Sequence, residues 1–118
     1  MPKALCGTLI KESLTDDRVL DLLEIKEVQI WKATNHTPNQ PAYWTAIAFS
    51  AGPECFLAEL ADSLRPEWYV DLSSSREKIV VLPHRVIRYP IGDAEGRKSA
   101  VEACRLAGIP ENQIDWKE

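Results

Sequence analysis

The stretch Glu67–Pro90, EWYVDLSSSREKIVVLPHRVIRYP, contains three short runs of β-branched and aromatic residues separated by turn-forming residues. Val, Ile, Tyr and Trp favour strands, whereas serine clusters favour turns. Pro83 has no N–H to donate to a sheet, so a tight turn or bulge there is favoured over one long strand. The stretch therefore predicts a three-stranded meander.

Both faces of the first hairpin in this stretch are apolar. Strand alternation places Trp68, Val70 and Leu72 on one face and Tyr69 and Asp71 on the other. The adjacent valines of the second strand must also divide between the two faces. An antiparallel sheet open to water normally has one polar face, so we expect the first two helices to cover one side and the last helix or a partner chain to cover the other.

The residues before the meander predict three strands and two helices. Alternation favours strands over residues 4–12, 25–34 and 42–50, and helical spacing favours helices over residues 13–24 and 52–65. The first helix has Thr15 or Asp16 as a candidate N-cap and Val19, Leu22 and Leu23 on one face. The second has Gly52 as its cap and Pro53 in its first turn, and its apolar stripe consists of Leu57, Leu60, Ala61 and Leu64.

A third helix is expected after the meander. Asp93 is its candidate N-cap, and Gly108 with Pro110 forms a stop signal. Its apolar face is poor in large side chains, so we expect it to pack closely; this face consists of Ala100, Val101, Cys104 and Ala107.

The order of elements predicts an α+β fold with a largely antiparallel sheet. The first six elements match a ferredoxin-like βαββαβ arrangement, extended by two strands and a C-terminal helix. The 118 residues fit a single domain spanning 1–118. The order of the strands within the sheet does not follow from the sequence.

Composition and charge argue against several classes of function. A chain with 45% hydrophobic and 27% charged residues is typical of a globular protein. The net charge of −4 disfavours binding to nucleic acid or to an anionic membrane. No apolar run is long enough for a membrane span or a secretory signal. The three distant cysteines, Cys6, Cys55 and Cys104, indicate reduced thiols and a cytoplasmic protein.

The candidate catalytic residues form no recognised motif. Asp71, the serines at 73–75 and His84 are the residue types of a hydrolase triad, but no Gly-x-Ser-x-Gly elbow is present. We therefore interpret the serines as a turn. His36 and His84 lie in expected loops without metal-ligand spacing, and no glycine-rich phosphate loop exists, so neither a metal nor a cofactor is expected.

Several segments together resemble a widespread family of small prokaryotic proteins that has no established activity. The matching segments are Gly7-Thr8 with Glu12-Ser13-Leu14, Trp44-Thr45, Trp68-Tyr69-Val70-Asp71, Ile79 to Tyr89, and Gly108-Ile109-Pro110 with Gln113-Ile114-Asp115. The family pattern reads IGTxIEESL, WYxDx, YVIFRxKVFK and GIPExQxD in chain order. This chain departs from it at Pro83-His84. The resemblance implies no catalytic residues.

We interpret the chain as a small binding or interaction protein without catalytic activity. A protein partner or self-association is expected, and a small-molecule ligand is the other candidate. The alternative is a small enzyme near Trp68, Tyr69, Asp71 and His84, with the last two as an acid/base pair if the fold brings them together. The candidate binding or interaction residues are Trp31, Trp44, Trp68, Tyr69, Asp71 and His84.

Overall fold

A computed structural model describes residues 5–51 and 55–116, without the side chain of residue 55. The described strands are β1 (Leu5–Ile10), β2 (Glu24–Lys32), β3 (Tyr43–Ala51), β4 (Val70–Ser73), β5 (Glu77–Leu82) and β6 (Arg85–Pro90). The α-helices are α1 (Cys55–Ser63) and α2 (Ala94–Leu106), and the 3₁₀ helices are η1 (Lys11–Ser13), η2 (Asp17–Leu22) and η3 (Glu111–Gln113).

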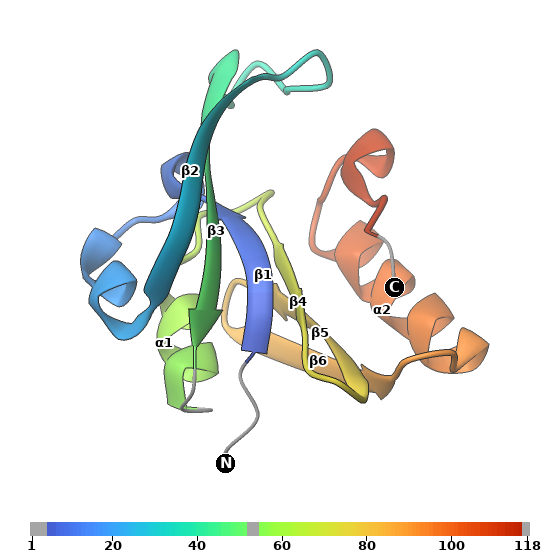
Figure 1. Ribbon diagram of the computed structural model, residues 1–118. Helices are drawn as coiled ribbons and strands as arrows, with labels where there is room; N and C mark the ends of the chain where they lie inside the picture. Colours follow the sequence, from blue (N-terminus) through green and yellow to red (C-terminus); the bar gives the residue numbers. More distant parts are fainter. Residues whose placement is uncertain (1–4, 52–54, 117–118) are drawn as a thin grey trace.

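The strands form one open antiparallel sheet in the order β2-β3-β1-β4-β5-β6 (Figure 1). The connection from β1 to β2 passes the position of β3, and that from β3 to β4 passes the position of β1. The other strand connections join neighbours. The expected α+β class and antiparallel sheet are thus confirmed, and the meander is β4-β5-β6.

Two separate cores lie on opposite faces of the sheet. Val70 and Leu72 of β4 belong to the core that α1 covers. Val80 and Leu82 of β5 belong to a second core, formed with α2 and the C-terminal segment. Figure 1 shows α1 and α2 on opposite sides of the sheet. Apolar side chains of this hairpin are thus buried on both faces, and on the second face α2 and the C-terminal segment cover Val80 and Leu82.

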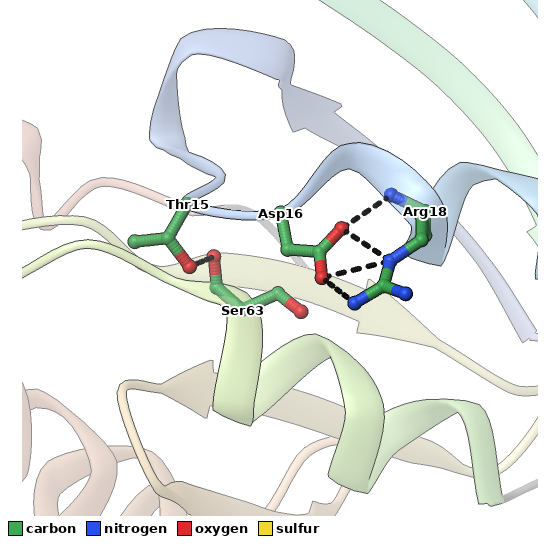
Figure 2. Close-up of polar contacts among 4 residues, drawn as sticks. All are labelled: Thr15, Asp16, Arg18 and Ser63. Carbon is green, nitrogen blue, oxygen red and sulfur yellow. Dashed lines mark hydrogen bonds and ion pairs between the residues drawn. The ribbon is translucent and has the colours of Figure 1, made fainter.

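The α-helix expected over residues 13–24 is wrong. Thr15 donates its backbone N–H to the carbonyl oxygen of Ser63 at 2.7 Å. Its Oγ1 donates to the same oxygen at 3.1 Å (Figure 2). Leu14 also forms an isolated bridge with Leu64. These long-range bonds commit residues 14 and 15 to the end of α1, so the remaining segment before β2 is short and forms the 3₁₀ helix η2.

The start of η2 follows the expected capping chemistry. The carboxylate of Asp16 accepts the backbone N–H of Arg18 at 3.0 Å and also pairs with its guanidinium (Figure 2). These hydrogen bonds lower the pKa of Asp16 to about 2. Val19 is buried, but Leu22, which was expected on the same face, is 41% exposed.

Helix α1 presents the expected stripe to the sheet. All four residues of that stripe are buried, and Phe56 beside them is fully buried against Phe49. The proposed cap at Gly52 and first turn at Pro53 lie outside the described residues. The stripe therefore accounts for how α1 seals the first core.

Helix α2 packs so closely on β6 that only glycine fits at one position. Asp93 caps the helix by accepting the N–H of Gly96 at 3.1 Å. A Cβ on Gly96 would lie 2.5 Å from the Cβ of Tyr89. At the other end of the same tyrosine side chain, the Tyr89 hydroxyl accepts the indole N–H of Trp116 at 2.8 Å. The C-terminal segment is thus attached to the same face of the sheet as α2.

Candidate ligand-binding cleft

A cleft of about 620 Å³ lies on the α2 side of the sheet, beside the helix and not beneath it. Strands β1, β3 and β4, the end of β2 and the C-terminal segment all contribute side chains to it. It contains five of the six residues that the sequence singled out; these are Trp31, Trp44, Trp68, Tyr69 and Asp71.

The floor of the cleft follows from strand register. Leu5 and Leu9 of β1 point into the α1 core. Thr8 and Ile10 alternate with them along the strand, so Thr8 and Ile10 face the α2 side and line the cleft. Asp71 likewise alternates with the buried residues of β4. The floor is therefore a mixed surface of a hydroxyl, an aliphatic chain and a carboxylate.

Three tryptophans form the aromatic part of the cleft. Trp31 and Trp44 are directly paired across β2 and β3, which places both on the cleft side. Trp44 packs edge-on against Trp68, with ring centroids 5.0 Å apart. Trp68 is only 7% exposed, whereas Trp31 is 41% exposed. Beside its mixed floor, the cleft thus has one packed pair of indoles, Trp44 and Trp68, and one solvent-accessible indole, Trp31.

The position of Trp68 corrects one expectation. Alternation predicted that it shares a face with Val70 and Leu72, but those two residues lie in the α1 core and Trp68 lines the cleft. Glu67 adopts a positive φ of 73°, which L residues rarely adopt, and the strand begins only at Val70. The turn at Glu67 therefore re-aims the indole away from the strand's alternation.

Asp71 is held in place by a buried lysine. Its carboxylate accepts from the ammonium of Lys78 at 2.8 Å, and the Lys78 side chain is only 6% exposed. The carboxylate is 34% exposed, so it is reachable from the cleft. Lys32 and Asp115 also line the cleft. The lining thus has two acidic side chains and one basic side chain, and Lys78, which is not part of the lining, offsets the charge of Asp71.

A buried glutamine pair joins the C-terminal segment to the β2–β3 connection. The amide nitrogen of Gln113 donates to the carbonyl of Asn35 and to Oε1 of Gln40, both at 2.7 Å. The backbone carbonyl oxygen of Gln113 accepts the hydroxyl of Tyr69. Burial raises the pKa of Tyr69, so the phenol keeps its proton and stays a donor. These bonds hold one wall of the cleft in place.

Sequence reasoning missed this wall. Gln113 and Asp115 line the cleft, yet no chemical motif singled them out. The available signal was their place in the NQID segment that carried the resemblance. Glutamine is exposed in most proteins, so the residue type itself gave no indication that Gln113 is buried.

His84 lies away from the cleft. It occupies the turn between β5 and β6 with a φ of 61°. Its backbone N–H donates to the carbonyl oxygen of Ala61 in α1 at 3.0 Å. Its Nδ1 lies 3.3 Å from the Asp62 carboxylate, and both side chains are exposed. Asp71 faces the α2 side, so the structure does not bring Asp71 and His84 together as an acid/base pair.

Of the serines after Asp71, Ser73 is the last residue of β4, and Ser74 shapes the turn that follows. The hydroxyl oxygen of Ser74 accepts the N–H groups of Arg76 and Glu77 at 3.3 and 3.1 Å. This oxygen is committed to the backbone of the β4–β5 turn, in agreement with the turn interpretation.

Within the described ranges, no group of three or more His, Cys, Asp or Glu side chains is arranged to hold a metal ion. Cys6 and Cys104 are free thiols, and the side chain of Cys55 lies outside the described part. No helix among the described residues is long and apolar enough to cross a membrane. No protein-family model, curated protein or solved structure matches the chain.

Proposed function

We propose that this protein binds a small organic ligand in the cleft and does not transform it. The observation that carries the proposal is the aromatic arrangement, in which Trp68 is buried against Trp44 while Trp31 stays 41% exposed across from Trp44. A preformed concave site with aromatic walls and a few fixed polar groups is typical of ligand pockets.

The lining chemistry suits a ligand with one flat apolar face and polar edges. Indole rings supply large contact area with little conformational freedom to lose. The Asp71 carboxylate can accept hydrogen bonds from a ligand at the floor of the cleft, and the Lys32 ammonium at the end of β2 can donate them. Because Lys78 offsets the charge of Asp71 and Lys32 that of Asp115, no excess of positive charge attracts a phosphate group, and the cleft favours a ligand of low net charge.

Catalysis is not supported by the geometry of the described residues. Asp71 is paired with Lys78, and His84 is on the other side of the sheet with Asp62. A general acid or base must reach the reacting proton within hydrogen-bond distance. His84 therefore serves as a control position for the binding site, not as part of it.

We also propose that the segment from β1 to β4 is a ferredoxin-like unit. The order β2-β3-β1-β4 supports this, since each of its two crossover connections passes one strand. The turns η1 and η2 take the place of the first helix, and β5, β6 and α2 extend the unit.

We further propose kinship with the family of small prokaryotic proteins and a cytoplasmic location. Contacts between motif segments support the kinship. The carboxylate of Glu12 accepts from the N–H of Thr45 at 2.7 Å, and Tyr69 donates to Gln113. The free thiols of Cys6 and Cys104 support a reducing compartment.

Ligand binding is tested with native mass spectrometry of the purified protein, followed by a thermal-shift screen of small aromatic and heteroaromatic metabolites. We expect a hit to raise the melting temperature and change tryptophan fluorescence. Trp31→Ala and Asp71→Asn should weaken its affinity at least tenfold, and His84→Ala should leave it unchanged. A screen without hits, or a hit bound equally by Trp31→Ala, would refute the proposal.

A further inference from the structure

The exposed apolar residues of this chain concentrate around one edge of the sheet. Of the eight large hydrophobic side chains recorded as exposed among the described residues, six lie on or beside β2. They are Leu22, Ile25, Val28, Ile30, Trp31 and Tyr43. A cluster of this kind, in contrast to isolated exposed side chains, marks an interaction surface.

β2 is an end strand, with β3 as its one neighbour in the sheet formed by the described residues (Figure 1). One of its edges therefore presents backbone N–H and C=O groups to solvent. Such an edge is a template for another strand. On the α1 side of β2, Val28 is 53% and Ile30 is 65% exposed, so the helical cover does not extend to this edge.

We propose that β2 pairs with β2 of a second copy of this chain, antiparallel about a twofold axis at Gln29. The pairing joins two six-stranded sheets into one continuous sheet. Such an isologous contact is the commonest form of homo-oligomer, because one self-complementary surface closes the assembly.

Side-chain chemistry selects the register. With the axis at Gln29, Val28 of each copy stands opposite Ile30 of the other, and both are exposed on the same face. With the axis at Ile30, Val28 would stand opposite Lys32. With the axis at Val28, Ile30 would stand opposite Lys26, where the pairing with β3 is irregular. Only the axis at Gln29 leaves neither Val28 nor Ile30 opposite a lysine.

The lysine that flanks this edge does not block the pairing. Edge lysines protect many natural sheets by placing an unpaired charge where a second strand would dock. Here the Lys26 ammonium pairs with the Glu24 carboxylate of its own strand at 2.7 Å. Glu24 precedes the irregularity and Lys26 lies within it. The regular pairing therefore runs from Glu27 to Trp31 and ends before Lys26 and Lys32, which this register would otherwise set opposite each other.

The pairing also reaches the cleft. In this register, Glu27 of the second copy stands opposite Trp31, which lines the cleft. Trp31 and Glu27 share the α2 side of the sheet, so the second copy adds a carboxylate beside the exposed indole. The dimer contact therefore lies next to the proposed binding site and rests on a separate observation.

A charge-swap series tests both the contact and its register. Sedimentation velocity of the wild-type protein should give a species of twice 13.3 kDa. Val28→Glu and Ile30→Lys should each give monomers. Each change sets a charge of one copy opposite an apolar side chain of the other, and it brings the two identical new charges close together across the axis. The double variant sets opposite charges across the axis and should restore the dimer. Leu106→Glu, at a distant side chain that is 80% exposed, should remain dimeric.

Each outcome bears on the proposal. Unchanged circular dichroism and urea midpoints in the single variants establish that they are folded, which the exposure of both positions favours. A monomeric wild-type protein at 100 µM, or dimeric single variants, would overturn the contact. A double variant that stays monomeric would overturn the register at Gln29.

Discussion

Replacing Gly96 with Ala tests how tightly α2 is fitted to β6. In an exposed helix this change stabilises a protein by about 1 kcal/mol, because alanine has the higher helix propensity. Here the new Cβ would lie 2.5 Å from the Cβ of Tyr89 and 3.0 Å from its Cγ. Tyr89 is 3% exposed, and its Cβ cannot move unless β6 moves with it.

The steric effect should outweigh the propensity effect. Overpacking of a close-fitted core costs about 1–3 kcal/mol, and so short an approach belongs in the upper half of that range. Subtracting about 1 kcal/mol of propensity leaves a net loss of about 1–2 kcal/mol. For a domain of this size, that loss lowers the melting temperature by about 4–8 °C.

Urea unfolding followed by far-ultraviolet circular dichroism measures this loss. Ser99→Ala is the matched control, because Ser99 is an exposed position of the same helix. We expect the control to be unchanged or more stable by up to about 0.5 kcal/mol. If Gly96→Ala were as stable as Ser99→Ala, the close contact between α2 and β6 would be refuted.

Three further predictions concern the two cores and the cleft wall. Burial raises the pKa of Cys104 from 9.0 to about 11, so its stabilising effect is full below pH 9 and is lost as the pH rises towards 11. Urea midpoints across this range should fall, and less steeply in Cys104→Ala. Gln113→Ala removes the acceptor of the buried Gln40 side-chain N–H and the side-chain donor to the Asn35 carbonyl. It should cost about 1–3 kcal/mol, against less than about 0.5 kcal/mol for the exposed Asn112→Ala. Leu60→Ala should cost about 2–5 kcal/mol in chemical denaturation, because Leu60 of α1 is fully buried in the core between the helix and the sheet. A loss below about 0.5 kcal/mol would contradict its core assignment.

The parts of the fold that the sequence predicted are those governed by local alternation. Period-two patterning divided the side chains of β4 and β5 between two faces, and the structure places Val81 and Val80 in the two different cores. The cap at Asp93 was likewise readable, because the side chain bonds an N–H only three residues away.

The parts that the sequence did not predict depend on contacts between distant residues. The 3₁₀ form of η2 follows from bonds between Thr15 and Ser63, which are 48 positions apart. The aim of Trp68 follows from one positive φ at Glu67, which no propensity indicates. The cleft wall depends on Gln40 and Gln113, which are 73 positions apart and pair only once the chain is folded.

The cleft and the packing of α2 are linked through the C-terminal segment. The indole N–H of Trp116 donates to Tyr89 and fixes the residue to β6. The Arg97 guanidinium of α2 donates to the backbone carbonyl of Trp116 at 2.6 Å and fixes it to the helix. Gln113, three residues earlier, holds the hydroxyl of Tyr69 at the cleft. A shift of α2 is therefore carried along a short, fixed segment to a residue that lines the site. Because Gly96→Ala displaces α2 from Tyr89, it should weaken ligand binding as well as stability, whereas a cavity on the opposite face at Leu60 should lower stability and leave affinity unchanged.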